Sequence, residues 1–240
     1  AWKLDAVLMG QAGDRLLDSY QSERRPHAKA MIDLSIHMKN FVSTANPLLS
    51  SLRNVATRTA RRTPGLREFL SEAKFKPRPR YEAGAYFGLP RQRRNGLEGE
   101  QLPQPTLADR ECRPLLLDEA LGEGYALIGF AVDPRQSLSA ADLQQLAQLN
   151  TRYLTLYPAG GRPQGKAAAS TPAGLSEWED MSGECIRRFR ETGYAEGAVA
   201  IVRPDRFVFA MARPGNAPAA VQSLLEQLGL QTATRQQEAS

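Results

Sequence analysis

The spacing of apolar residues predicts that the first third of the chain is helical. Trp2, Leu4 and Leu8 recur at helical intervals with no capping residue before them, so we interpret the start as a helix entered partway and the chain as a fragment of a longer protein. Asp14 is suited to cap the next helix, and Pro26 either kinks one long helix or begins another. The further helices are expected over residues 14–20, 28–42, 48–62 and 66–73.

The second half of the chain combines apolar runs of strand length with helical patterns. Strands are predicted at 125–132, 152–157, 198–202 and 207–211. Helices are predicted at 139–149, 178–192 and 217–228, and the stretch 160–174, rich in Gly, Ala, Ser and Pro, is expected to be a loop. The order β-α-β-α-β-β-α predicts an α/β fold, a mixed sheet with helices on both faces, which is the arrangement of a thioredoxin-like domain.

The last two predicted strands are joined across Arg203-Pro204-Asp205-Arg206. Proline cannot supply the positive φ that a type I′ turn requires. We therefore expect a type I turn within a slightly longer loop or beside a bulge.

A long connection rich in proline and arginine separates the helical part from the α/β part. It runs from Lys74 to Pro105 and contains Tyr81, Tyr86 and Phe87, so parts of it are expected to lie pinned along a surface. We predict four segments, which are a helical part at 1–76, a linker at 77–106, a thioredoxin-like domain at 107–232 and a polar tail at 233–240.

The 240-residue chain carries a formal net charge of +5, which is unevenly distributed. Residues 1–80 contain 15 Lys and Arg against 7 Asp and Glu, a net +8, whereas residues 81–240 contain 16 against 19, a net −3. An apolar fraction of 42% and a charged fraction of 24% are typical of a globular protein and argue against disorder of the whole chain. No run of 18 apolar residues and no signal-peptide pattern occurs, so no membrane partner is expected and the predicted location is cytoplasmic.

The few cysteines and histidines exclude several kinds of site. Cys112 and Cys185 lie 73 positions apart, which excludes a CxxC redox pair, a Cys-rich zinc cluster and a disulfide framework. His27 and His37 lie ten positions apart and do not share the i, i+4 face that a metal-binding pair needs. We therefore expect two reduced, partly buried thiols and no metal site.

Three loop sequences resemble functional motifs, but each lacks a required part. A working thioredoxin needs a low-pKa cysteine just after its first core strand, and the corresponding stretch Val132–Leu138 contains no thiol. Gly122-Glu123-Gly124 begins like a dinucleotide fingerprint but lacks its third glycine and precedes a strand instead of following one. Gly160-Gly161-Arg162 lacks the Gly-Lys-Ser/Thr end of a phosphate loop. We expect a tight turn at the first glycine pair and a flexible loop at the second.

Two groups of charged residues allow a functional and a structural interpretation. The arginines between 53 and 62, with Arg91, Arg93 and Arg94, form a candidate nucleic-acid surface, but they are dispersed around a helix and no aromatic residues interleave with them, so no nucleic-acid partner is expected. The acidic residues crowd the start of the predicted helix 178–192, where the helix dipole favours carboxylates, so capping is predicted rather than a pair of catalytic acids; they are Glu177, Glu179, Asp180 and Glu184.

Several stretches resemble one enzyme family. Ala1–Leu4, Leu16–Tyr20 and Glu23–Pro26 resemble the segment after the second flavin-binding motif of FAD-dependent aromatic-ring hydroxylases of the para-hydroxybenzoate hydroxylase type. The stretches similar to the C-terminal thioredoxin-like domain of the larger members are Leu102–Pro105, Asp118–Tyr125, Asp180–Gly183 and Val202–Val208. The closest resemblance is to the 3-(3-hydroxyphenyl)propionate/3-hydroxycinnamate hydroxylases, and it covers nearly the whole chain.

The resemblance implies that the parent enzyme is a monooxygenase of aromatic catabolism. Such an enzyme uses NAD(P)H and O2 to add one oxygen atom to a phenolic ring, with FAD as cofactor. None of the family's flavin motifs matches a position in this chain. The resemblance therefore implies that residues 1–76 are the end of the FAD and substrate domain, and that the chain contributes no catalytic, cofactor-binding or metal-binding residue. Packing, stability and homodimer contacts are its expected roles, and it should not hold FAD tightly by itself.

A second hypothesis remains open on the sequence alone. It takes the chain to be a free-standing, non-catalytic interaction module whose basic helical arm docks on an acidic partner. If the chain is instead the end of a flavin monooxygenase, the apolar faces of its N-terminal helices should associate with the missing N-terminal FAD-binding portion or with a second copy of the chain.

Overall fold

The computed structural model describes residues 1–44, 46–65, 68, 80–89, 96–163 and 172–230. Their contacts divide the chain into two compact units, one made of Ala1–Gln21 with Glu82–Ser240 and the other of Ser22–Tyr81. This division does not coincide with the expected boundary at residue 76, because residues 1–21 pack with the α/β part. The expected helix 66–73, except for residue 68, the middle of the expected loop 160–174 and the expected tail 233–240 lie outside the described residues.

The N-terminal helices are α1 (Trp2–Leu8), α2 (Arg15–Val42) and α3 (Pro47–Arg62). The structure decides between the two alternatives for Pro26, because α2 is a single helix that contains it. The start of α3 follows from its sequence. The Asn46 side chain accepts hydrogen bonds from the amides of Leu48 (2.9 Å) and Leu49 (3.4 Å), and Pro47 occupies a first-turn position that needs no amide donor.

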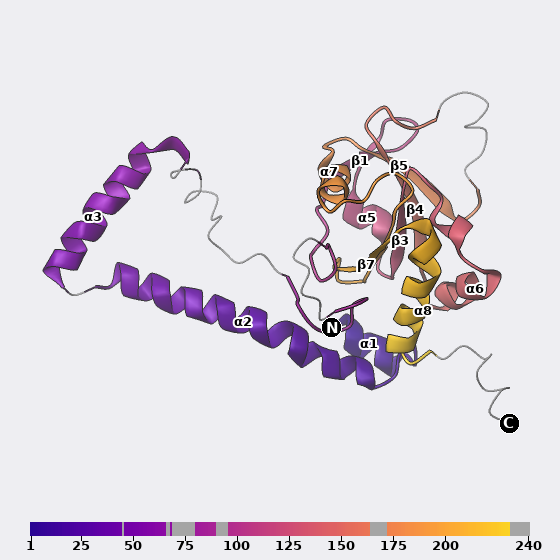
Figure 1. Cartoon of the computed structure of the whole chain (residues 1–240), viewed down its shortest axis with the longest axis horizontal. Coiled ribbons are helices and arrows are strands. Elements are labelled where there is room, and N and C mark those ends of the chain that lie inside the picture. Colours follow the sequence, from indigo (N-terminus) through magenta and orange to yellow (C-terminus); the bar gives the residue numbers. More distant parts are fainter. Residues whose placement is uncertain (45, 66–67, 69–79, 90–95, 164–171, 231–240) are drawn as a thin grey trace. The chain divides into compact units, whose positions relative to one another are not determined.

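Seven strands form one mixed sheet in the order β2-β1-β5-β4-β3-β6-β7 (Figure 1). The strands are β1 (Thr106–Ala108), β2 (Pro114–Leu116), β3 (Ala126–Phe130), β4 (Arg152–Pro158), β5 (Leu175–Asp180), β6 (Val199–Val202) and β7 (Val208–Ala212). The helices of this unit beyond residue 100 are α5 (Leu117–Leu121), η1 (Pro134–Ser137), α6 (Ala140–Gln148), α7 (Glu184–Glu191), η3 (Pro214–Asn216) and α8 (Ala217–Gln227).

The expected thioredoxin-like arrangement is confirmed in the strands β4-β3-β6-β7. β3 and β4 are parallel across the α6 crossover, and β6 and β7 add antiparallel partners on the other side of β3. β5 extends the sheet parallel to β4, and β1 and β2 continue it in antiparallel pairing. α6 and α8 pack on one face, and α5 and α7 pack on the other (Figure 1).

The prediction of a helix over 178–192 is wrong at its start. Residues Leu175–Asp180 form β5, and the helix α7 begins at Glu184. The strand forms despite its acidic residues because it pairs with β4 on one side and β1 on the other, and these pairings are between residues distant in sequence. The three-residue strands β1 and β2 and the short helix α5 are further elements that the hydrophobic pattern did not predict.

The predicted turn between the last two strands is confirmed. The Arg206 amide donates to the Arg203 carbonyl oxygen at 2.9 Å, which closes a turn with Pro204 at its second position. The pairing of β6 with β7 shifts register between Ile201 and Val202, and Arg206 has φ +68°. The sequence-based expectation of a bulge beside this turn therefore holds.

Parts of the proline-rich connection lie along the outer edge of β7, as expected from its aromatic residues. The Phe87 amide donates to the Phe209 carbonyl oxygen, and the Gly99 amide donates to that of Val208, both at 3.0 Å. The Val208 amide in turn donates to the Glu100 carbonyl oxygen at 2.9 Å. These bonds satisfy backbone groups that an open sheet edge would leave unpaired.

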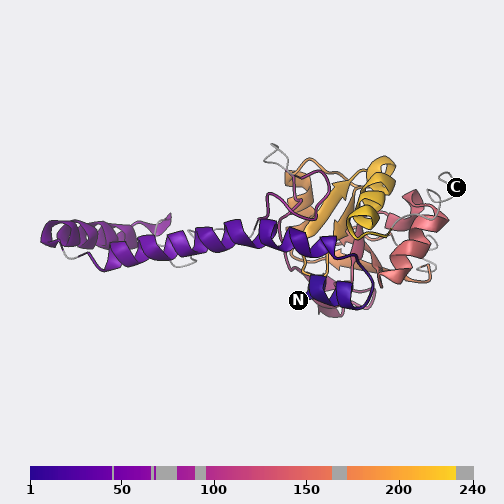
Figure 2. The same ribbon diagram turned by 90° about the horizontal axis from the view of Figure 1, so that it is seen from below.

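Two hydrophobic cores lie on the two faces of the sheet, and β3 contributes to both. Ile128 and Phe130 point into the core beneath α5 and α7, whereas Leu127 points into the core beneath α6 and α8. Burial on both faces explains why the β3 sequence is apolar throughout. α1 packs against the second core through Trp2 and Val7, and Figure 2 shows α1 beside the sheet.

Candidate functional site

The position where a thioredoxin carries its reactive cysteine holds an ion pair in this chain. The Asp133 carboxylate precedes η1 and accepts hydrogen bonds from the Arg135 amide (3.0 Å) and from Arg135 Nη2 (2.8 Å). Arg135 Nη1 also donates to the Ala173 carbonyl oxygen at 2.7 Å. Burial raises the pKa of Asp133, but the hydrogen bonds from Arg135 outweigh it, so the pKa is lowered overall and the pair stays ionised. This arrangement fixes a loop and offers no redox chemistry.

The two cysteines lie in different settings. Cys185 is fully buried on α7, and burial, followed by the nearby charges of Asp180 and Glu184, raises the pKa of its thiol well above the ordinary value. Cys112 is exposed in the turn between β1 and β2. Both thiols are free, as their spacing predicts, but the expectation that they are partly buried is wrong, because Cys112 is exposed and Cys185 is fully buried.

The glycine motifs have structural explanations in the described residues. A Cβ atom on Gly124 would lie 2.6 Å from the Asn150 carbonyl oxygen, so this position needs a glycine for close backbone approach. The amides of Gly160 and Arg162 donate to the Glu179 carboxylate at 3.4 and 3.3 Å. The donors that a phosphate would need are therefore already directed at a side chain.

These observations bear directly on a dinucleotide cofactor. Binding of its pyrophosphate needs a glycine-rich turn between a strand and the amino end of a helix. Among the described residues, β3 is followed by the ion pair of Asp133 and Arg135. β4 is followed by backbone amides that already donate hydrogen bonds to the Glu179 carboxylate. Neither of these two turns therefore fits the pyrophosphate of FAD.

The acidic residues around 177–184 divide between a strand and a helix cap. Asp180 ends β5 and accepts hydrogen bonds from the amides of Gly183 (2.8 Å) and Ile186 (3.1 Å), so the predicted capping role is confirmed for this residue. For Glu177 the prediction of a capping role is wrong. It lies on β5, pairs with Arg110 and accepts a 3.5 Å hydrogen bond from the Tyr157 hydroxyl. Glu179 also lies on β5.

The remaining candidates are two histidines and the candidate nucleic-acid arginines. The histidines and the arginines between 53 and 62 lie on the helices of the second unit, whereas Arg91, Arg93 and Arg94 lie outside the described residues. His27 and His37 both lie on α2, and the described residues contain no group of three His, Cys, Asp or Glu side chains that could hold a metal ion. Arg53 donates to the Phe41 and Val42 carbonyl oxygens at the end of α2, which assigns it a structural role. No helix in the described part of the chain is long and apolar enough to cross a membrane.

The most elaborate polar arrangement of the first unit surrounds Arg203, which is 1% exposed. Its guanidinium lies between two aromatic rings, 4.4 Å from the Tyr86 centroid and 5.0 Å from the Trp2 centroid. Asp205 accepts two hydrogen bonds from it, from Nε at 3.1 Å and from Nη2 at 2.7 Å, and Nη1 donates to the Ala85 carbonyl oxygen at 3.1 Å. We call Trp2, Tyr86, Arg203 and Asp205 the arginine clamp.

The arginine clamp joins three segments that are far apart in sequence. Trp2 begins α1, Tyr86 belongs to the proline-rich connection, and Arg203 and Asp205 belong to the turn between β6 and β7. Trp2 is fixed further by a 2.8 Å hydrogen bond from its Nε1 to Asp205 and by an edge contact with Tyr125 at 5.9 Å. The sequence pattern predicts Trp2 on a helix and Tyr86 along a surface, and it indicates no role for Arg203 beyond the turn.

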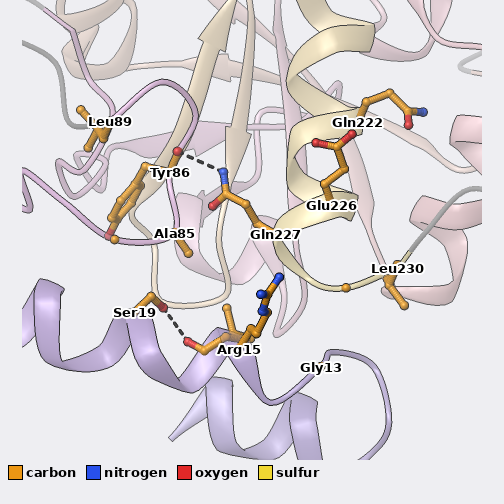
Figure 3. A pocket seen from close by; sticks show the side chains of 13 residues that line it. Gly13, Arg15, Ser19, Ala85, Tyr86, Leu89, Gln222, Glu226, Gln227 and Leu230 are labelled. Carbon is orange, nitrogen blue, oxygen red and sulfur yellow. Dashed lines mark hydrogen bonds between the residues drawn. The ribbon is translucent and has the colours of Figure 1, made fainter.

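A hollow of about 850 Å³ lies beside the clamp, between the start of α2, the segment around Tyr86 and the end of α8 (Figure 3). Gln227 Nε2 donates to the Tyr86 carbonyl oxygen at 3.2 Å across it, and the Gly13 amide donates to the Leu228 carbonyl oxygen at 2.8 Å beside it. Arg15 and Glu226 are the charged side chains among its described lining residues. The hollow thus marks a seam between these segments, and the described residues that line it include no group of three side chains that could hold a metal ion.

Two family profiles match different parts of the chain. The sequence profile of the HcaD C-terminal domain matches residues 99–227, and the profile described as FAD binding domain matches residues 1–35. The arginine clamp therefore links the segment that matches the FAD binding domain to the domain that matches the HcaD C-terminal domain.

Curated relatives match nearly the whole chain. A protein of Klebsiella pneumoniae (strain 342) is 32% identical over 97% of this chain, and one of Mycobacterium avium (strain 104) is 34% identical over 85%. Both are named 3-(3-hydroxy-phenyl)propionate/3-hydroxycinnamic acid hydroxylase. The chain spans 41% and 37% of their respective lengths.

Solved structures show a similar fold. The match to aklavinone-11 hydroxylase with FAD and aklavinone has a TM-score of 0.55 at 19% identity, covering 95% of this chain and 38% of that one. The match to the flavin-dependent monooxygenase PieE in complex with FAD and substrate has a TM-score of 0.54 at 20% identity, covering 96% of this chain and 42% of that one.

Proposed function

Because the chain belongs to the HcaD C-terminal domain family and is the C-terminal part of an FAD-dependent aromatic-ring hydroxylase, we propose that its parent enzyme hydroxylates a 3-hydroxyphenylpropionate-like phenolic acid. One atom of O2 enters the ring, the other leaves as water, and NAD(P)H supplies the two electrons. The product is a catechol, and the enzyme acts in the cytoplasm. The names of the curated relatives support the proposed substrate class and the hydroxylation.

In this proposal the chain itself has a mechanical role. The arginine clamp is the observation that supports it, because its hydrogen bonds and ring contacts fix residues 1–8 of the FAD-binding segment to the thioredoxin-like domain. The guanidinium and the Asp205 carboxylate neutralise one another in a buried setting, which favours a fixed geometry. The chain thus supplies structural and oligomerisation elements and has no activity alone.

The test uses the whole polypeptide, with its upstream part, and this chain alone. We expect the whole polypeptide to retain FAD through gel filtration and to oxidise NADH faster when 3-(3-hydroxyphenyl)propionate is added, with a catechol detected by mass spectrometry. The chain alone should elute without FAD and without this activity. A whole polypeptide that hydroxylates none of a series of phenolic acids would overturn the proposed reaction. FAD that remains bound to the isolated chain would overturn its mechanical role.

A further inference from the structure

The hollow beside the arginine clamp has the size and the apolar lining of a small-molecule site. Its volume of about 850 Å³ lies within the range of about 300–1,000 Å³ that is typical of such sites. All of its described lining residues belong to the first unit. The apolar side chains among them are Leu16, Ala85, Leu89 and Leu230. They can pack against the body of a small organic molecule.

The two charged side chains of the hollow come from different elements. Arg15 is the first residue of α2, and Glu226 lies at the end of α8. Figure 3 shows the Arg15 guanidinium directed toward α8. Within the described part of the chain, neither side chain forms an ion pair or a hydrogen bond, although Asp14 and Asp18 are close to Arg15 in sequence. The hollow thus offers a guanidinium donor and a carboxylate acceptor that no described residue uses.

The chemistry of these groups defines the kind of molecule that fits. An exposed charge is ordinarily solvated and indicates no site by itself, but here two opposite charges border one apolar hollow. A guanidinium binds a carboxylate through two parallel hydrogen bonds. The ionised Glu226 carboxylate only accepts hydrogen bonds, so it requires a donor such as a hydroxyl group. A phenolic acid combines a carboxylate, an apolar ring and a hydroxyl at the far side of that ring.

We propose that this hollow binds a phenolic acid, with its carboxylate on Arg15 and its ring hydroxyl on Glu226. The choice of a phenolic acid rests on the proposed function, which names this class as the substrate. Arg15 lies within the FAD binding domain match at residues 1–35, and Glu226 lies within the HcaD C-terminal domain match at residues 99–227. The bound acid therefore bridges the two matched segments and stabilises the first unit, because it binds only the folded arrangement.

The first test is isothermal titration calorimetry of this chain alone with three probes. They are 3-(3-hydroxyphenyl)propionate, its uncharged carboxamide and 3-phenylpropionate, which lacks the ring hydroxyl. We expect the hydroxylated acid to bind with one molecule per chain and to raise the unfolding midpoint of the chain. The carboxamide should bind about tenfold more weakly, because it loses the charged pair with Arg15, and 3-phenylpropionate about fivefold more weakly, because it has no donor for Glu226.

The second test repeats these titrations with substituted chains. Arg15→Gln should bind the hydroxylated acid about tenfold more weakly and no longer distinguish it from the carboxamide. Glu226→Ala should no longer distinguish the hydroxylated acid from 3-phenylpropionate. Arg187→Gln is the matched control and should bind like the original chain, because Arg187 lies on α7, is 66% exposed and does not line the hollow. Near-UV circular dichroism shows whether each variant is folded, and the three probes on the unsubstituted chain decide if one is not.

Three results would overturn the proposal. They are no saturable binding of the hydroxylated acid at millimolar concentration, equal affinity for the acid and its carboxamide, and unweakened binding by Arg15→Gln. The proposed reaction is tested separately, because catechol formation is measured with the whole polypeptide. Binding by this chain without catechol formation by the whole polypeptide would refute the reaction and leave the site intact. Catechol formation without binding by this chain would refute the site and leave the reaction intact.

Discussion

Replacing Arg203 with alanine removes the group that holds three segments of the first unit together. The substitution removes the two hydrogen bonds that the guanidinium donates to the Asp205 carboxylate, which then keeps only the one donated by Trp2 Nε1 among those described. It also leaves an empty space beside the rings of Trp2 and Tyr86. The Ala85 carbonyl oxygen also loses its donor. The residues 1–8 are then held mainly by the packing of α1 on the second core.

The expected loss of stability follows from the burial of the pair. Removing one partner of a buried ion pair costs about 3–5 kcal/mol, because the remaining charge is left without compensation. Asp205 is 27% exposed in its side chain, so water reaches it and the lower end, about 3 kcal/mol, applies. Each of the two cation–π contacts adds about 0.5 kcal/mol or more, which brings the total to about 4 kcal/mol. For a unit of this size, that loss lowers the unfolding midpoint by roughly 8–16 °C.

The assay is thermal unfolding of this chain, followed by tryptophan fluorescence and near-UV circular dichroism. Arg113→Ala is the matched control, because Arg113 also pairs with an aspartate nearby in sequence but is 74% exposed. Exposed ion pairs contribute little, so this variant should unfold at almost the same temperature as the original chain. The double variant Arg203→Ala/Asp205→Asn should recover part of the loss, because it removes the uncompensated charge. A midpoint shift for Arg203→Ala no larger than that of the control, or no recovery in the double variant, would refute the reasoning.

Three further predictions concern the thioredoxin-like unit. Ellman's reagent should modify Cys112 in the folded chain and reach Cys185 only after unfolding, because burial raises the pKa of that thiol and shields it; two thiols that react at similar rates in the folded chain would contradict this. Burial raises the pKa of Asp133, but the neighbouring guanidinium lowers it below 3.8 overall, so its stabilising contribution is complete above that pH and is lost as the pH falls toward the lowered value. Asp133→Asn should therefore reduce the fall in urea midpoint between pH 6 and pH 3, and an unchanged fall would argue against it. Gly124→Ala should lower the free energy of unfolding by about 1–3 kcal/mol, because its Cβ would lie 2.6 Å from a backbone carbonyl oxygen, whereas Gly215→Ala, whose Cβ meets nothing within 4 Å, should be close to neutral in the same denaturation experiment.

Local sequence determined the elements whose stabilising contacts lie within a few residues. α3 begins where Asn46 accepts the first amides of the helix, and α6 begins where Ser139 and Asp142 form a reciprocal capping box. The continuous apolar run of β3 predicted a strand buried on both faces. Since these signals act over short distances, the sequence was sufficient to place them.

The elements that the sequence did not predict depend on distant partners. β5 carries acidic residues that resemble a helix start, and it becomes a strand because β4 and β1 supply its hydrogen bonds. β1 and β2 have three residues each, which is too short for a periodic pattern to be recognised. Their existence is a consequence of the sheet, not of their own sequences.

The arginine clamp shows the same limit for the candidate site. By itself the sequence determined a turn at Arg203–Arg206, a helix at Trp2 and an aromatic residue at Tyr86 that would lie along a surface. An arginine in a turn is ordinarily solvated, and burying its charge is costly unless a carboxylate and further acceptors are present. Only the tertiary structure brings Trp2, 203 residues from Asp205, to the same point and completes the pair, so the clamp could not be read from the residues around Arg203.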